Sequence, residues 1–409
     1  MANKLTNKGD SRPMMKDIKL NSLLEITKAI NNNFSTAKLL DIFEEVLKDQ
    51  LNIGKLVLFS YDETWKCLLK YGIDEDFNTL DVSREIAHIK EISTIDFSKR
   101  SLKKSFEIVI PVFHKSNALA YLLIGDINED KLEVSPGIKH LPFIQTLTNI
   151  IVVAIENKKL AKESIRQAAM NKELELASEM QSMLFPASLP NDDQLEIAAC
   201  YQPHDQVGGD YYDFIRLSEN EIAFCMADVS GKGVAAAILM SNFQANLRIL
   251  FNHTTSLTDL VKELNTKVMA SAKGEKFITL FIAKYNMVTK VLNYINAGHN
   301  PPLIVNGKSI SLLKIGCTGL GMFDELQKVK EGIVNISAKS TILCYTDGVV
   351  ELENENSEDF GVKKLVEILT KNPKLKMNEL IELINKQLKD HKGRRPYIDD
   401  IALFGCRIL

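Results

Sequence analysis

Asp210 and Asp228 lie at equal distances from the centre of a predicted β-hairpin. Asp210 ends the run Val-Gly-Gly-Asp, and Asp228 begins the run Asp-Val-Ser-Gly-Lys-Gly. Between them, residues 211–217 and 221–227 are typical of strands, and the polar residues 218–220 predict the turn. A regular hairpin places the two carboxylates opposite each other on neighbouring strands, with side chains roughly 5 Å apart.

Such a pair of carboxylates calls for a neutralising partner. Like charges directly opposite each other repel, so the bare pair is destabilising. A bound divalent cation removes the repulsion, and carboxylate oxygens together with water suit a hard ion such as Mg²⁺ or Mn²⁺. Spacing alone leaves two alternatives open. The residues could be surface aspartates beside a glycine turn, or a one-residue bulge could spoil the pairing.

Further acidic residues stand at the ends of other predicted strands. Asp347 ends an apolar run and is followed by Gly348, which permits a sharp turn and close approach of the backbone to an ion. Asp399 and Asp400 begin the last predicted strand, 401–409. Strand-end carboxylates often carry active-site ligands, and several together could supply a site for two metal ions. Each one alone could also be an ordinary turn aspartate.

Composition narrows the class of protein. The chain has 409 residues, a formal net charge of −3 and 45% hydrophobic residues, which favours a globular protein of two or three domains. This balance gives no support to nucleic-acid or membrane-surface binding. The six cysteines are scattered and include no CxxC pair, so we expect neither disulfides nor a zinc site, as in a protein of a reducing compartment. The N-terminus lacks the apolar segment of a signal peptide, and the most apolar segment, 149–155, is too short to span a bilayer. We therefore expect a cytoplasmic protein.

The first part of the chain predicts a small α+β module. Residues 1–17 are typical of a flexible tail, and residues 18–51 predict two helices. Four strand-like runs and a helix follow, up to residue 155, and this order fits an α+β domain. The layout of residues 18–155 resembles a GAF domain, which implies a sensor that binds a small ligand or a protein of unknown identity. This resemblance rests on the pattern of elements and not on a motif.

Residues 156–186 predict a helical linker. No glycine or proline occurs from 156 to 184, and apolar residues recur at a spacing of three to four. Glu163 and Gln167 interrupt the apolar seam, so the pattern is that of an imperfect coiled coil. It predicts a homodimer, and the alternative is a helix that packs only on its own domain.

Residues 187–409 predict a sheet-rich α+β domain that carries a set of short motifs. These motifs are VGGDYYDF, ADVSGKG, NAGHNPPL, YTDGVVE and the terminal DDIALF, preceded by EMQSMLFP at 179–186. Their order and spacing resemble those of the SpoIIE/RsbU-like branch of the PPM metal-dependent protein serine/threonine phosphatases. The resemblance implies a β-sandwich of two antiparallel sheets with helices outside. It also implies two Mn²⁺ or Mg²⁺ ions bound at one edge of the sandwich.

The resemblance also implies roles for particular residues. Asp210 and Asp228 would hold the metals at the catalytic centre, the Val229 carbonyl would be a backbone ligand, and Asp347 and Asp399 would complete the site.

Three further residues in or beside these motifs have two possible interpretations each. Asp400 is an alternative to Asp399 as a metal ligand. His299, in the motif AGHN, is either a general acid or a structural turn residue. Lys232 either helps to attract phosphate or is a solvated loop lysine.

The implied function is hydrolysis of phosphoserine or phosphothreonine on a protein, by attack of a metal-activated water on phosphorus. In this branch the substrate is typically a phosphorylated STAS-domain antagonist of an anti-sigma factor. We therefore expect signal transduction in which the N-terminal sensor controls the phosphatase. Two alternatives remain: a catalytically silent signalling scaffold with the same fold, and a phosphatase of small molecules. The acidic positions, all present, speak against the scaffold.

Overall fold

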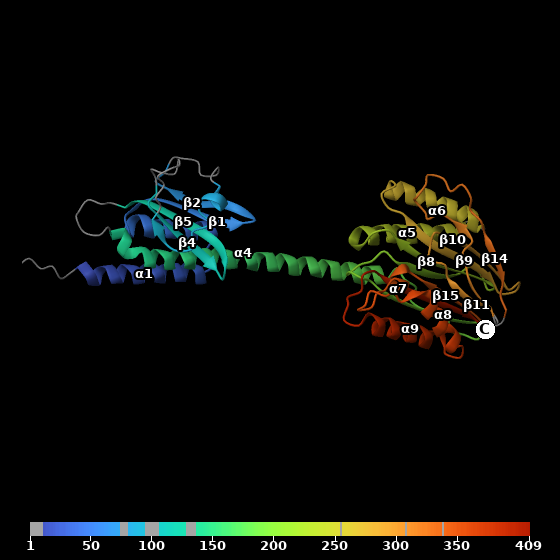
Figure 1. The fold of residues 1–409 in the computed structure, drawn as a ribbon. Coiled ribbons are helices and arrows are strands. Elements are labelled where there is room, and N and C mark those ends of the chain that lie inside the picture. The colour runs from blue at the N-terminus through green and yellow to red at the C-terminus, as the bar shows by residue number, and fades with distance from the viewer. Residues whose placement is uncertain are drawn as a thin grey trace, which may run out of the picture. The chain divides into compact units, whose positions relative to one another are not determined.

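The structure is a computed structural model, and its chain divides into two compact units, residues 1–168 and 169–409 (Figure 1). The described residues are 11–73, 81–94, 106–127, 136–253, 256–306, 309–337 and 339–409.

The first unit is an antiparallel sheet with the strand order β2-β1-β5-β4-β3. Its strands are β1 (Ile53–Asp62), β2 (Thr64–Tyr71), β3 (Ser93–Thr94), β4 (Ile108–His114) and β5 (Asn117–Ile127). Its helices are α1 (Ser11–Asn31), α2 (Thr36–Glu45), the π-helical turn η1 (Val46–Gln50), α3 (Val82–Glu85) and the first part of α4 (Pro136–Ser182). Leu56 and Leu58 of β1 face α1, α2 and α4, whereas Val57 and Phe59 face α3, as the two-residue period of a strand requires.

The predicted order of helices, strands and helix is confirmed for the first unit, but the predicted tail is wrong in part. Helix α1 begins at Ser11, so residues 11–17 are helical, because they continue the helix that buries Ile26 in the core. Residues 1–10 lie outside the described residues. The likeness of this unit to a GAF domain stays a prediction.

Helix α4 runs through the predicted linker and ends at Ser182. Several of its apolar side chains are exposed: Leu160, Ile165, Met170 and Met180 are between 53% and 72% exposed. These side chains do not all lie on one face of the helix, but exposed apolar surface of this kind is what a second helix would cover. The dimeric coiled coil remains a prediction.

The second unit is a sandwich of two sheets. One sheet has the order β13-β10-β9-β8-β7, with β14 also paired to β10, and the other has the order β12-β11-β15-β16-β6. The strands are β6 (Leu195–Gln202), β7 (Tyr211–Arg216), β8 (Glu221–Val229), β9 (Ile278–Asn286), β10 (Val291–Ala297), β11 (Leu303–Asn306), β12 (Ser309–Leu312), β13 (Gly316–Cys317), β14 (Gly332–Asn335), β15 (Ser340–Tyr345) and β16 (Ile401–Ile408). The helices are α5 (Gly233–His253), α6 (Leu257–Ala272), α7 (Asp347–Val350), α8 (Gly361–Lys371) and α9 (Met377–Lys392).

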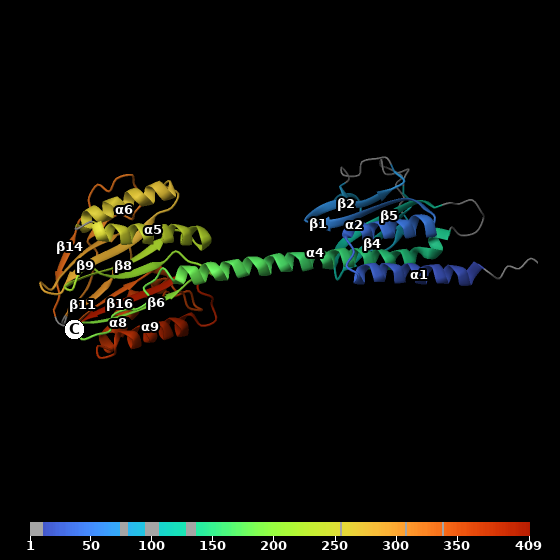
Figure 2. The ribbon, with the colours of Figure 1, turned by 180° about the vertical axis from the view of Figure 1, so that it is seen from behind.

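Apolar layers hold this sandwich together. Phe224, Phe281 and Phe404 lie between the sheets, and the rings of Phe224 and Phe404 stack with their centroids 5.5 Å apart. Helices α5 and α6 cover the outer face of the first sheet, and α8 and α9 cover that of the second (Figures 1 and 2). The predicted β-sandwich with outer helices is confirmed.

Two details of the second unit differ from the expectation. β13 pairs with β10 in parallel, because the chain reaches β13 by crossing from the other sheet and not by a hairpin. The sharp turn predicted after Asp347 is the short helix α7.

Among the described residues, Gly233–Phe251 is the single segment long and apolar enough to cross a membrane. Its buried residues pack on the first sheet, which accounts for much of its apolar composition.

Candidate functional site

The hairpin of β7 and β8 carries the first two aspartates. Its register is continuous and pairs Tyr211 with Ala227. The hairpin is therefore centred on the predicted turn, and no bulge displaces the pairing. Asp210 directly precedes β7, and Asp228 pairs with Thr279 of β9 on its other side.

The second sheet brings two more aspartates to this edge. Asp347 follows β15 and Asp399 precedes β16, and these strands are neighbours whose ends meet at the pair Tyr345 and Leu403. Position 348 must be glycine, because a Cβ atom there would lie 2.1 Å from the carbonyl oxygen of Asp400.

The pKa values show that these carboxyl groups lie in one electrostatic environment. Burial, then the charge of Asp228, raises the pKa of Asp210 well above its usual value. Burial, then Asp347 and Asp399, raises the pKa of Asp228 to about 7. Burial, then Asp399, raises the pKa of Asp347. The predicted aspartates of both sheets are thus brought together, and their negative charges repel one another.

The donor atoms suit a hard cation. Asp210 is 2% exposed, and its Oδ2 atom has no hydrogen-bond partner. Leaving such an atom buried and unpaired costs about 1–3 kcal/mol, which a bound cation would offset. The carbonyl oxygen of Val229 lies beside the same loop, 2.9 Å from the place a Cβ atom on Gly209 would take. Carboxylate and carbonyl oxygens are the donors that Mg²⁺ and Mn²⁺ prefer.

The carboxylates are not, however, arranged as a finished metal site. Within the described ranges, no group of three or more His, Cys, Asp or Glu side chains could hold a metal ion as it stands. Asp399 also has a cationic partner within the protein, because Lys232 Nζ lies 3.0 Å from Asp399 Oδ2. Ligand side chains would have to turn for a cation to bind.

Asp399 and Asp400 have different surroundings in the structure. Asp400 is 9% exposed, and its carboxylate accepts the backbone N–H groups of His204 and Gly209, each at 2.7 Å. Asp400 therefore holds the loop that leads to Asp210. A Cβ atom on Gly208 would lie 2.2 Å from Asp400 Oδ2, so this loop needs glycine there.

Gln181, in the last turn of α4, holds the same loop from the other side. Its side-chain amide donates to the Gly208 carbonyl at 2.7 Å, and the Gly208 N–H donates back to Gln181 Oε1 at 3.2 Å. Gln181 is 6% exposed. Sequence reasoning missed this residue, whose one signal is its place in the segment EMQSMLFP.

His299 is buried at the margin of the cluster. Its Nδ1 atom lies 2.8 Å from Thr279 Oγ1, and its backbone N–H donates to Asn296 at 2.8 Å. Burial lowers the pKa of His299 to about 3, so the ring is uncharged at neutral pH. A buried, uncharged imidazole is a poor general acid, which favours the structural interpretation.

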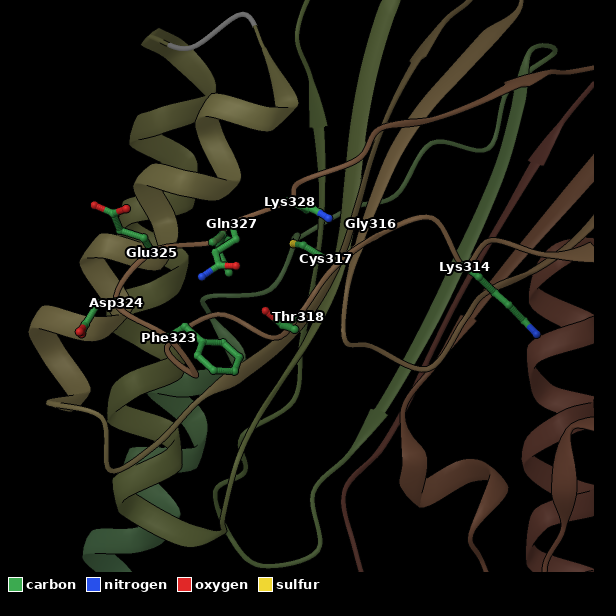
Figure 3. Close-up of a pocket in the computed structure, with 10 residues that line it drawn as sticks. Lys314, Gly316, Cys317, Thr318, Phe323, Asp324, Glu325, Gln327 and Lys328 are labelled. Carbon is green, nitrogen blue, oxygen red and sulfur yellow. The ribbon is translucent and has the colours of Figure 1, made fainter.

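A cavity of about 970 Å³ lies beside β13, in the segment 314–328, and none of the aspartates above lines it. Its charged side chains do not converge: Asp324 and Glu325 lie on one side, and Lys314 lies on the other (Figure 3). The cavity therefore offers no reactive group comparable to the carboxylate cluster.

The raised carboxyl pKa values predict how stability depends on pH. Between the unfolded carboxyl pKa near 4 and the folded pKa of Asp228, about 7, the folded state holds protons that the unfolded state has lost. Stability without divalent cations should therefore fall as pH rises from about 5 to 8. Melting temperatures in EDTA would measure this, with Asp228→Asn flattening the curve. A wild-type melting temperature that rises over this range would contradict the prediction.

Comparisons with known proteins agree with this geometry. Residues 218–409 match the family described as Stage II sporulation protein E (SpoIIE). This range contains Asp228, Asp347 and Asp399, and Asp210 lies just before it. The chain is 30% identical over 204 residues to the phosphoserine phosphatase RsbU of Bacillus subtilis, covering 49% of this chain and 61% of RsbU. It is 26% identical over 322 residues to protein IcfG of Synechocystis sp., covering 72% of this chain and 50% of IcfG.

A solved structure supports the fold. The SiaA-PP2C domain of Pseudomonas aeruginosa superposes with a TM-score of 0.54 at 19% identity, covering 60% of this chain and 99% of that domain. The chain spans between half and about three fifths of the length of the curated relatives named above. The motifs, the two-sheet sandwich and these matches agree with one another: residues 218–409 match the SpoIIE family, and the C-terminal part of the chain has the fold of a PP2C phosphatase domain.

Proposed function

We propose that this protein hydrolyses phosphoserine or phosphothreonine on a protein substrate and depends on Mn²⁺ or Mg²⁺. The observation that carries the proposal is the meeting of Asp210 and Asp228 from one sheet with Asp347 and Asp399 from the other, around an unpartnered buried oxygen of Asp210. Mutual repulsion makes such a cluster costly unless a cation is its normal partner.

Particular residues would hold two ions in this proposal. Asp210, Asp228, Asp347 and Asp399 offer carboxylates, and Val229 offers its carbonyl oxygen. Divalent cations there would supply an activated water and neutralise charge on the phosphoryl oxygens.

The chain itself orients these donors. Asp400 and Gln181 hold the loop that leads to Asp210. Asp400 accepts the Gly209 N–H, and the Gln181 side chain donates to the Gly208 carbonyl oxygen, each at 2.7 Å. We assign Asp399 and not Asp400 as the ligand, because Asp399 is 40% exposed, whereas the Asp400 carboxylate is buried and accepts the N–H groups of two loop residues.

A protein substrate fits this site better than a nucleic acid or a small molecule. The carboxylates lie at strand ends, and Asp399 is 40% exposed, so a phosphoserine on a folded protein could approach. The net charge of −3 offers no basic groove for nucleic acid. The relative RsbU bears the name phosphoserine phosphatase, which supports a phosphoserine substrate here. We propose a phosphorylated STAS-domain protein of a sigma factor pathway.

The first unit would then act as a GAF-like sensor in a cytoplasmic homodimer. The exposed apolar side chains of α4 support the dimer, and the buried contact of Gln181 with Gly208 supports a role for α4 in control. The ligand of the sensor is not assigned.

One assay tests the proposed function. Phosphate release from a phosphorylated STAS-domain protein should require Mn²⁺ or Mg²⁺ and should stop in EDTA. If Mn²⁺ raises the melting temperature while no phosphoprotein or phosphopeptide is hydrolysed, the catalytically silent scaffold is the better description.

We expect kcat/KM to be at least about tenfold higher on a folded phospho-STAS protein than on its excised phosphopeptide. Contacts outside the phosphate orient a folded substrate, and a short peptide loses them. Initial rates at low substrate concentration measure both values. Equal values would indicate a general phosphatase without a docking surface, and faster turnover of small phosphomonoesters would favour the small-molecule alternative.

A further inference from the structure

Lys232, in the glycine loop between β8 and α5, is bound to the segment that carries Asp399. Its Nζ atom lies 3.0 Å from Asp399 Oδ2 and also donates to the carbonyl oxygen of Ile398. Gly231 and Gly233, on either side of it, have φ angles of +86° and +72°, which favour glycine. The loop thus holds Lys232 in a defined place, and this lysine is not a freely solvated one.

The ammonium group of Lys232 acts within the carboxylate cluster. Burial and the charge of Asp399 raise the pKa of Asp347, and the charge of Lys232 offsets part of this effect. The oxygen Asp399 Oδ2 already has a cationic partner in Lys232 Nζ. A divalent cation that uses this oxygen must therefore displace the ammonium group.

We propose that Lys232 is an internal cation that competes with a divalent metal ion for Asp399. It stabilises the cluster when no metal is bound and weakens metal binding at this edge of the site. This inference rests on the proposed metal-dependent function.

A second lysine, between α6 and β9, contacts the same loop and offers a matched control. Lys276 Nζ donates to the carbonyl oxygen of Ser230 at 2.8 Å, so it also binds the glycine loop. The described contacts give Lys276 no ion pair with the site aspartates. Lys232→Met and Lys276→Met therefore each remove one positive charge beside the glycine loop, but only the first frees Asp399.

The test is calorimetric titration of the full-length protein with Mn²⁺, together with melting temperatures in EDTA. Lys232→Met should bind Mn²⁺ about fivefold more tightly than wild type, a modest effect because the ion pair is half exposed. Its melting temperature in EDTA should fall, because the repulsion among the aspartates loses its counter-charge. Lys276→Met should leave the Mn²⁺ affinity unchanged.

Several results would overturn the inference. One is an unchanged or weaker Mn²⁺ affinity in Lys232→Met. If that affinity is unchanged and KM for the phosphoprotein rises, Lys232 binds phosphate and does not compete with the metal. Another is an equal gain in Lys276→Met, which would indicate a general effect of charge. If Lys232→Met does not fold, Lys232→Gln keeps a donor for Ile398 without the charge and should show the same gain. Absence of Mn²⁺ binding in the wild type would instead contradict the proposed metal-dependent function itself.

Discussion

Replacing Asp228 by Asn should abolish Mn²⁺-dependent phosphate release while the fold stays intact. The substitution removes a carboxylate from the centre of the cluster, where burial and neighbouring aspartates raise its pKa to about 7. Loss of a ligand from ions that activate the nucleophile should raise the barrier by several kcal/mol, a rate loss of about a thousandfold or more. Phosphate release by the purified variant measures the loss of activity, and circular dichroism checks that the fold is intact.

The same variant should be more stable than wild type in EDTA, because it removes one of the repelling charges. Asp324→Asn is a matched control, since Asp324 lies in the same unit but lines the cavity beside β13. It should change neither activity nor stability appreciably. A variant at position 228 that retains more than about a tenth of wild-type turnover would contradict the metal assignment.

Breaking the connection between α4 and the loop before Asp210 should uncouple control from catalysis. A rigid helix can bias a catalytic domain only through contacts that differ between its states. Two glycines inserted after Ser178 interrupt the helix, and Gln181→Ala removes the paired hydrogen bonds to Gly208. Either change should leave phosphatase activity at one level, with and without the activating input.

The control for this experiment is Lys172→Ala, which removes an exposed side chain from the same helix. It should respond to the input as wild type does. The measurement is the ratio of phosphatase rates in cells with the input present and absent. A normal ratio in both altered proteins would make α4 a passive tether.

The sequence by itself determined much of the local structure and the family resemblance of the C-terminal part. The two strand-like runs 211–217 and 221–227 and the polar turn at 218–220 predicted the hairpin of β7 and β8, and the register of Tyr211 with Ala227 agrees. The start of α6 depends on an equally local signal, because the side chain of Ser256 accepts the N–H of Asp259 at 3.3 Å. Such signals are local, since they depend on the side-chain period and on capping groups a few residues away.

Only the tertiary structure decided what each polar residue near the site does. Asp399 and Asp400 are adjacent in sequence, yet only Asp400 has its carboxylate filled by the N–H groups of His204 and Gly209. Lys232 had two interpretations, and its ion pair with Asp399 depends on a segment 166 residues away. These outcomes are set by contacts between distant parts of the chain and by burial. A period or a motif in the sequence carries no information about which oxygen is already occupied.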